Sequence, residues 1–267
     1  DSDFVWSRDG KKLYFTSDRD FNTRIFEMDL ATLAVKPLWQ RDEDVTHLSL
    51  CPDGHHLAFW VAGGEGGLFT LHLADGAVKR VARVPGAHWQ VSGAGDFAWS
   101  PDMQWIAYTQ RGENRAMNIW VVPSAGGEPR NVTRLNAHHS QPAWSPDGKY
   151  LFFQSDRDGA GLYVLPLQPE AARLTDTDLK FEKPKDNVKV DIDFTNIQRR
   201  IRKLSGQNPA ADLLVTTDGT IAFMSEGDVW TVSYDGKEMK RQTTGGGKSG
   251  LRVLLESKNA VFVQEIG

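Results

Sequence analysis

Short apolar runs alternate with turn residues along the whole chain. The clearest stretch is residues 142–159, in which a Pro-Ala-Trp segment leads into the turn Ser-Pro-Asp-Gly and the apolar run 150–153 leads into a second turn. Pro146 has the backbone angle that a turn needs, Asp147 can accept hydrogen bonds from the backbone ahead of it, and Gly148 tolerates the left-handed conformation that closes the turn. The pattern predicts a strand, a tight turn, a second strand and a second turn.

This unit recurs along the chain. Equivalent segments begin at Val5, Ser49, Ala98, Pro142 and Leu214, and a sixth begins at Leu251. Four strands in roughly 40 to 50 residues is the period of a propeller blade. A solenoid would need a helix or a shorter coil in every repeat, and a β-sandwich would show no such period. We therefore predict an all-β fold: a single β-propeller domain over residues 1–267, built of four-stranded antiparallel blades. Five blades and part of another are visible, and the complete protein would have six or seven.

Two sets of repeated positions are predicted to be structural. Tryptophans end the first strand of several units, and an aspartate occupies the turn that follows. These residues are Trp6, Trp99 and Trp144, and Asp9, Asp53, Asp102, Asp147 and Asp218. We expect the tryptophans to be buried between blades, so that Trp6→Ala or Trp144→Ala would each cost about 3–5 kcal/mol.

One interval between units is longer than the others. It contains a polar insertion at about residues 168–187, and residues 188–194 then alternate apolar and polar. This alternation, followed by a basic run, predicts a hairpin over residues 188–204 on the outer edge of a blade. The basic residues would discourage sheet-to-sheet aggregation, and a site for phosphate or an acidic partner is the alternative. They are Arg199, Arg200, Arg202 and Lys203.

Composition excludes several classes of function. A net charge of −4 argues against nucleic-acid binding, which needs a strongly basic face. No apolar run is long enough to span a membrane, so we expect no membrane insertion. No basic and apolar leader opens the chain. Cys51 is the only cysteine of the chain, so it cannot form an internal disulfide. We expect its small side chain to fill space beside a turn.

The Trp-Ser-Pro-Asp-Gly-Lys and Ser-Asp-Arg-Asp-Gly units resemble the repeats of TolB-type propellers, which are shared with tricorn-type peptidases and prolyl-oligopeptidase relatives. Residues 190–201 more narrowly resemble a segment in the propellers of tricorn-type, tail-specific serine peptidases. The tricorn resemblance implies a propeller that guides peptides toward a separate catalytic domain. The TolB resemblance implies a periplasmic scaffold that docks other proteins.

The chain lacks the motifs of nucleophilic or phosphate chemistry. Residues 247–251, Gly-Lys-Ser-Gly-Leu, miss the nucleophile-elbow pattern at its last position. A phosphate loop ending at Lys248 and Ser249 would need a glycine where Gln242 stands, and a helix after it. The Ser-Asp-Arg-Asp turns offer too few oxygens for calcium, and an internal ion pair with the arginine explains them better. We predict no cofactor and no catalytic residue.

Two histidine pairs, His55-His56 and His138-His139, raise the question of a metal. Neither has a recognisable supporting cysteine or a partner at helical spacing, so we expect solvated loop histidines and no metal site.

One set of polar residues has a predicted binding role. Residues three positions before the end of each first strand would line the axial channel of a propeller, and they are rich in carboxylates. Like charges around a narrow channel are costly unless a cation or a basic peptide group lies among them, although ordered water is the alternative. These channel-mouth candidates are Asp3, His47, Asp96, Gln141 and Asp212.

The sequence thus predicts a non-catalytic module that binds a protein or peptide. The preferred setting is substrate gating in a larger tricorn-type peptidase whose catalytic domain lies in the same chain. The alternative is a free-standing TolB-like docking scaffold, and an enzyme with its site in the channel is the third class. The compartment is open, with a periplasmic or secreted location preferred to the cytoplasm.

Overall fold

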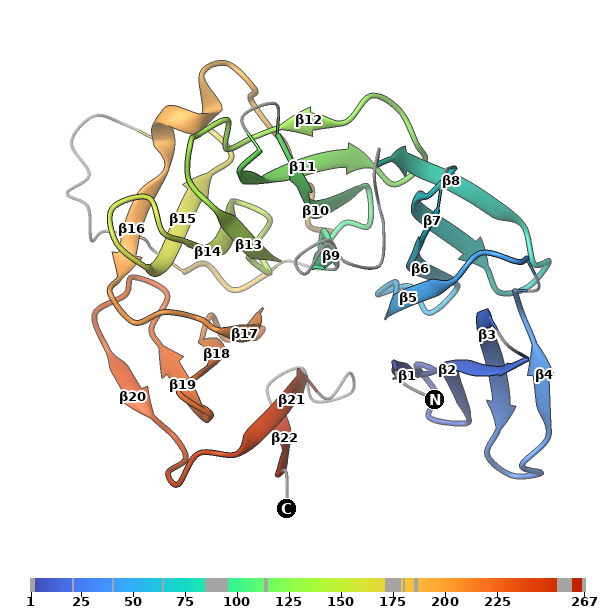
Figure 1. The fold of residues 1–267 in the computed structure, drawn as a ribbon. Helices are drawn as coiled ribbons and strands as arrows, with labels where there is room; N and C mark the ends of the chain where they lie inside the picture. Colours follow the sequence, from blue (N-terminus) through green and yellow to red (C-terminus); the bar gives the residue numbers. More distant parts are fainter. Residues whose placement is uncertain are drawn as a thin grey trace. The chain divides into compact units, whose positions relative to one another are not determined.

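A computed structural model describes residues 3–20, 22–39, 41–63, 65–84, 96–112, 115–170, 179, 181–184, 187–253 and 261–265 (Figure 1). The chain divides into two compact units. The first comprises Asp1–Gly95 with Val122–Pro129, and the second comprises Asp96–Val121 with Arg130–Gly267. The described residues form five four-stranded sheets and one two-stranded sheet.

The first unit holds two blades. Blade one consists of β1 (Phe4–Trp6), β2 (Lys12–Asp20), β3 (Asn22–Asp29) and β4 (Val35–Pro37). Blade two consists of β5 (Val45–Leu50), β6 (His56–Val61), β7 (Gly67–His72) and β8 (Val78–Arg83).

The second unit contains most of blade three and the strands that follow it. Blade three consists of β9 (Phe97–Trp99), β10 (Trp105–Arg111), β11 (Met117–Pro123) and β12 (Arg130–Asn131). Blade four consists of β13 (His139–Trp144), β14 (Tyr150–Ser155), β15 (Gly161–Pro166) and β16 (Arg202–Ser205), and the 3-10 helix η1 (Ile197–Arg200) precedes β16. Blade five consists of β17 (Ala211–Val215), β18 (Ile221–Ser225), β19 (Asp228–Val232) and β20 (Met239–Arg241), and β21 (Lys248–Val253) pairs with β22 (Val261–Glu265).

Every four-stranded sheet is an antiparallel meander, because its strands lie side by side in chain order. This is the arrangement that the repeat predicts, and the predicted all-β architecture of four-stranded blades is confirmed. Its physical basis is local. Short apolar runs, buried on both faces in the middle strands, make the strands, and short turns join neighbouring antiparallel strands.

The same turn joins the first two strands of each blade. In blade one, Ser7 Oγ donates to Asp9 Oδ1 at 2.7 Å and accepts the Lys12 N–H at 2.8 Å. The turn aspartate of every blade accepts the backbone N–H two residues ahead, at 2.7–3.2 Å, and these aspartates are Asp9, Asp53, Asp102, Asp147 and Asp218. The predicted turn aspartates therefore stabilise the turns by accepting backbone hydrogen bonds.

Apolar side chains fill the space between neighbouring blades within each unit. In the first unit, Trp39 packs edge-on against Phe59, with ring centroids 5.2 Å apart. In the second unit, Trp144 and Phe153 of blade four join Ile119 of blade three in one core. Burial of such large side chains is the main stabilising contribution in a fold with this little helix.

The prediction that Trp6 is a core residue is wrong. Its side chain is 46% exposed, whereas the equivalent Trp144 is 6% exposed and Trp99 is half-buried. Trp144 packs against blade three, which precedes its own blade. In the described part of the first unit no blade precedes blade one, so Trp6 has no equivalent surface there.

The predicted hairpin over residues 188–204 is also different in the structure. Residues 188–194 form no strand, η1 follows, and only β16 is a strand, paired with β15 as the outer strand of blade four. Apolar and polar residues alternate in 188–194 even without a strand, because the segment packs on the protein and buries Val190 in the core between blades three and four. Its N–H is satisfied by the Asp102 carboxylate at 2.8 Å rather than by a strand partner.

The basic residues of this segment mostly have structural contacts. Arg200 donates to three backbone carbonyls and pairs with Asp193 at 2.8 Å, which holds the irregular segment in place. Arg202 pairs with Glu170, and Lys203 donates to the carbonyls of Asp158 and Gly159.

The predicted insertion at 168–187 falls largely outside the described residues, because 171–178, 180, 185 and 186 are not among them. Its described part is not purely solvated. Leu179 is buried, and Phe181 packs edge-on against Tyr234 of blade five with ring centroids 5.2 Å apart.

Candidate functional site

A cavity of about 310 Å³ opens on the first strands of blades three, four and five. It lies within the second unit, where β9, β13 and β17 run into their turns. Its lining residues are almost all of apolar type, with two tryptophans and three prolines, although polar atoms of these residues form a large part of the exposed wall. The lining residues are Phe97, Ala98, Trp99, Pro101, Pro142, Ala143, Trp144, Ser145, Pro146, Leu213, Leu214 and Val215. We call it the inner-strand pocket.

The lining residues of the inner-strand pocket are suited to binding and not to reaction. None of them is ionisable, so none can act as a general acid or base. The only hydroxyl among them belongs to Ser145, which is fully buried and accepts the N–H groups of Lys149 and Tyr150 at 3.0 and 2.8 Å. Trp144 is held in place by donating from Nε1 to the Ala98 carbonyl at 3.0 Å.

The predicted channel-mouth residues lie at or just before the starts of first strands, and all of them except His47 bond to the sheet that follows. In the first unit, Asp3 Oδ2 accepts the His47 N–H at 2.7 Å. In the second unit, Asp96 Oδ2 accepts the Gln141 N–H at 3.1 Å, and Asp212 Oδ2 accepts the Leu251 N–H at 3.0 Å.

Gln141 bridges in the same way to blade five. Its Nε2 donates to the Ala210 carbonyl at 2.8 Å and its Oε1 accepts the Leu213 N–H at 3.1 Å. The backbone is bulged at these positions, because His47, Gln141 and Asp212 have φ angles of 57°, 54° and 53°. A bulge turns the N–H away from its own sheet, which makes it available to the side chain of the preceding blade. The structure thus gives these residues contacts between blades, and a bound cation among them stays a prediction.

We expect Asp96→Ala to lower the free energy of unfolding by about 1–2 kcal/mol, because the Gln141 N–H would lose its charged acceptor. Asp96→Asn keeps an acceptor oxygen and should lose clearly less. Chemical unfolding followed by circular dichroism compares the two variants with the wild type. Equal stability of all three proteins would contradict a role for Asp96 in joining the blades.

The histidine pairs depart from the prediction of solvated loops. His139 is the first residue of β13 and is fully buried, with its ring edge-on to Phe153 at 5.4 Å between centroids. Burial lowers the pKa of His139 to about 4. In the first unit, His56 lies beside Cys51 and Asp53, so the expectation that neither pair has a supporting cysteine is wrong. The signal was present in the spacing of Cys51-Pro-Asp-Gly-His-His56, which a tight turn folds back on itself.

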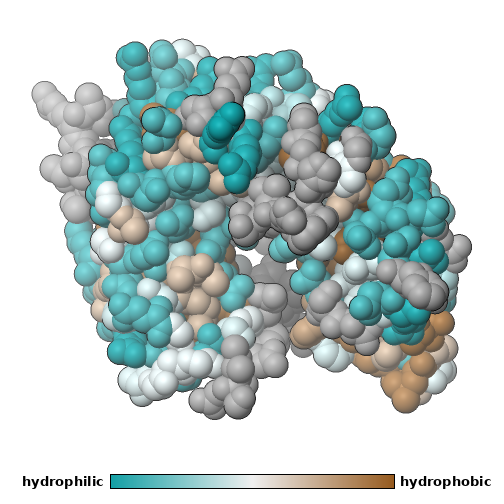
Figure 2. All heavy atoms as spheres, viewed as in Figure 1, coloured by the Kyte–Doolittle hydropathy of each residue, from teal (hydrophilic) through white to brown (hydrophobic). Residues whose placement is uncertain are grey.

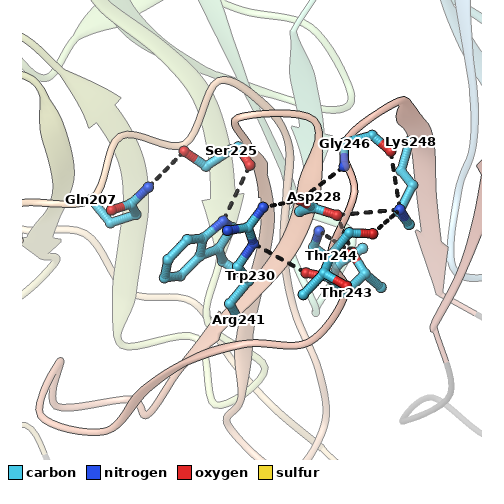
Figure 3. Close-up of polar contacts among 10 residues, drawn as sticks. Gln207, Ser225, Asp228, Trp230, Arg241, Thr243, Thr244, Gly246 and Lys248 are labelled. Atoms are coloured by element: carbon cyan, nitrogen blue, oxygen red, sulfur yellow. Dashed lines mark hydrogen bonds and ion pairs between the residues drawn. The ribbon is translucent and has the colours of Figure 1, made fainter.

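The glycine-rich run after blade five is a structural loop (Figure 3). Asp228 is fully buried, and its carboxylate pairs with Arg241, with Lys248 at 3.2 Å and with the Gly246 N–H at 3.2 Å. Hydrogen bonding to Arg241 is the largest cause of the lowered pKa of Asp228. Lys248 also donates to the carbonyls of Thr244 and Gly246, so with Asp228 its ammonium group has three partners inside the loop.

Comparison with known proteins places the fold. No protein-family model matches the chain. An uncharacterized peptidase, YuxL, of Bacillus subtilis is 30% identical over 109 residues, which is 40% of this chain and 16% of that protein. The tricorn protease homolog 1 of Streptomyces coelicolor is 28% identical over 119 residues (45% of this chain and 10% of that protein). A TolB homolog of Chlorobium chlorochromatii is 28% identical over 149 residues (55% and 32%). The matched segments therefore span a third or less of these three relatives.

Solved structures show the same similarity at the level of fold. The tricorn protease matches with a TM-score of 0.68 at 16% identity, covering 96% of this chain and 28% of its own. A putative TolB from Agrobacterium tumefaciens matches with a TM-score of 0.58 at 15% identity, covering 89% and 78%. An oligogalacturonate lyase in complex with manganese matches with a TM-score of 0.65 at 15% identity, covering 94% and 67%. The chain is a β-propeller similar to those of tricorn and TolB, and the fold occurs in binding proteins and enzymes alike.

Proposed function

We propose that this propeller is a non-catalytic module that binds peptides or extended protein segments in its inner-strand pocket. The observation that carries the proposal is the lining of that pocket, in which Trp99, Trp144 and three prolines offer apolar contact and no group offers chemistry. Aromatic-lined, concave surfaces of this kind bind apolar side chains of a partner.

The backbone around the inner-strand pocket supports an extended ligand. β9, β13 and β17 each stand at one end of the strand order of their sheets, so one edge of each strand has no partner within its own sheet. The Gln141 and Leu213 N–H groups and the Ala98 carbonyl already bond to neighbouring blades, and the remaining groups of such edges can bond to a peptide while the pocket receives one of its side chains. In the view of Figure 2 the described surface is mostly hydrophilic, with smaller hydrophobic areas. A recess that exposes aromatic and proline side chains on such a surface supports a binding role.

The finer proposal is that the module guides peptides within a larger tricorn-type peptidase. The tricorn protease contains a fold like this one over 96% of the present chain, which corresponds to 28% of its own chain. The alternative is a TolB-like docking scaffold, supported by the matched TolB homolog and the TolB structure, and it favours a periplasmic location. No helix in the described residues has the length and apolar character needed to cross a bilayer.

The coding sequence upstream and downstream of residues 1–267 distinguishes the tricorn-type peptidase from the TolB-like scaffold. A serine-peptidase core encoded downstream would support the tricorn-type proposal. An α/β domain with a signal peptide encoded upstream would support the TolB-like alternative.

Binding is tested with the purified chain and an array of immobilised, labelled ten-residue peptides that differ in their apolar content. We expect peptides with aromatic or large aliphatic residues to bind with dissociation constants of about 1–100 µM. Pro101→Arg combined with Pro146→Arg should weaken that binding at least about tenfold, because charged side chains would enter the apolar rim. The turn should tolerate arginine, since Arg8 occupies this position in blade one.

Pro52→Arg is the matched control. It makes the same change at the same turn position of blade two, which is exposed and does not line the pocket. Peptides recovered after incubation should be intact. Peptide cleavage by the wild type, or equal losses of binding in the control and the double variant, would refute the proposal.

A further inference from the structure

The first turn of blade two brings three metal-ligating side chains together. It joins β5 to β6, and the ligand atoms of Cys51, Asp53 and His56 all lie within 4.8 Å of one another (the strands are labelled in Figure 1). His56 Nδ1 lies 3.0 Å from Asp53 Oδ2. Cys51 is 2% exposed, whereas the carboxylate and the imidazole are partly exposed. The thiol therefore lies beneath two ligands that an ion can reach from solvent.

The backbone of the turn holds these side chains in place. The Gly54 N–H donates to the Cys51 carbonyl and the Cys51 N–H donates to the His56 carbonyl, both at 2.8 Å. The His55 N–H donates to Asp53 Oδ1 at 2.7 Å. Ligands fixed in this way lose little conformational entropy when an ion binds.

The turn does not require this combination of residues. Where blade two has Cys51, the other blades have a hydroxyl residue, namely Ser7, Ser100, Ser145 or Thr216. Where it has His56, the others have Lys12, Trp105, Tyr150 or Ile221. A hydroxyl serves the turn well, because Ser7 Oγ both donates and accepts there. The thiol and the imidazole are therefore found in this turn in blade two alone among the five described blades. Cys51 and His56 both bond Asp53 there, but a serine makes the same bond to the turn aspartate in blade one.

A second histidine lies across the strand pair. His72 of β7 is the register partner of His56, and the two ring centroids are 4.8 Å apart. His72 Nδ1 contacts Asp75 Oδ1 at 2.8 Å. A carboxylate on the far nitrogen is the usual way in which a protein orients a metal-binding imidazole. His72 is not among the residues whose ligand atoms lie within 4.8 Å of one another, but its ring lies against that of His56 and it is the candidate for a fourth ligand.

We propose that this turn binds one Zn²⁺ ion through Cys51 Sγ, the Asp53 carboxylate and His56 Nδ1, with His72 as the fourth ligand. Sulfur, nitrogen and oxygen donors in a four-coordinate site are those that Zn²⁺ prefers. The thiol proton leaves to solvent as the sulfur binds the ion. The ion would join the turn to β7 and stabilise blade two. The site lies in the first unit, shares no residue with the inner-strand pocket and does not rest on the proposed function.

The test uses the whole chain, freed of metal with a chelator and titrated with Co²⁺ as a spectroscopic substitute for Zn²⁺. We expect one ion per chain, with a thiolate-to-cobalt charge-transfer band that Zn²⁺ then displaces. Zn²⁺ should also raise the melting temperature. Cys51→Ser should abolish the charge-transfer band and, like His56→Gln, weaken Zn²⁺ binding more than about tenfold.

The variants include their own controls. Cys51→Ser restores the residue that blades one, three and four carry in this turn, so the protein should fold. His55→Gln removes an adjacent, exposed histidine that is not in the cluster and should leave binding unchanged. Cobalt binding without a charge-transfer band, or an equal loss of affinity in His55→Gln and His56→Gln, would overturn the proposal and indicate adventitious surface binding.

Discussion

Trp144→Ala is expected to lower the free energy of unfolding by about 3–5 kcal/mol, the usual cost of removing a large buried aromatic side chain. Trp144 is 6% exposed and packs in the core between blades three and four. The variant would leave a cavity there and would leave the Ala98 carbonyl without its indole donor. The measurement is denaturant unfolding followed by circular dichroism.

Trp6→Ala is the matched control for this prediction. Trp6 occupies the same position of the repeat but is 46% exposed, so its loss should cost less than about 1.5 kcal/mol. Trp144→Phe keeps most of the apolar contact and should fall between the wild type and Trp144→Ala. If Trp6→Ala and Trp144→Ala were equally destabilising, the different burial of the two positions would be contradicted.

His139 is expected to make the protein less stable as the pH falls from about 6.5 to about 4.5. The ring is fully buried and makes no hydrogen bond to any residue that the structure describes. Burial lowers its pKa from 6.5 to about 4, so the unfolded chain binds a proton on this residue before the folded chain does. Protonation therefore favours unfolding below pH 6.5, and the effect levels off below about pH 4, where the folded state is protonated as well.

The expected loss between about pH 7.5 and pH 4.5 is about 2–3 kcal/mol. His139→Leu removes the titrating group and leaves no polar atom without a partner. Between about pH 7.5 and pH 4.5 the free energy of unfolding of this variant should therefore fall by about 2–3 kcal/mol less than that of the wild type. His55→Leu, which alters an exposed histidine, should keep the wild-type pH dependence. The free energy of unfolding, measured at several pH values for the three proteins, tests this. Parallel curves for the wild type and His139→Leu would refute it.

Asp228 adds a separate effect at lower pH. Because its folded-state pKa lies below 3.8, its contribution to stability is fully present above that value and is lost as the pH falls further. This carboxylate therefore does not interfere with the histidine effect between pH 6.5 and 4.5.

The repeat made the blades predictable because the information is local. The Ser-Pro-Asp-Gly turn needs its own proline, aspartate and glycine, and Gly148, with a φ of 72°, is an example of the last. The apolar runs on each side of that turn then form a hairpin whatever lies further away. The turn aspartates and the strand order could be read from the sequence for this reason.

The errors have one cause, which is that burial depends on neighbours distant in sequence. Trp6 and Trp144 stand in similar local sequences, yet a preceding blade within the same unit covers only the second. Residues 188–194 alternate like a strand, but their backbone bonds to side chains in place of a strand partner: Asp102 accepts the Val190 N–H, and Gln168 donates to the Asp191 carbonyl. The channel-mouth residues share a position in the repeat, which the sequence shows, while their bonds to the neighbouring blade needed coordinates.

The sequence by itself determined the blade architecture, because turn chemistry and strand periodicity act over a few residues. Tertiary structure decided which of the equivalent residues are buried, where the inner-strand pocket lies, and that His72 of β7 lies against His56 of β6. These features depend on side chains from different strands and blades reaching the same point in space, and no spacing along the chain encodes that distance.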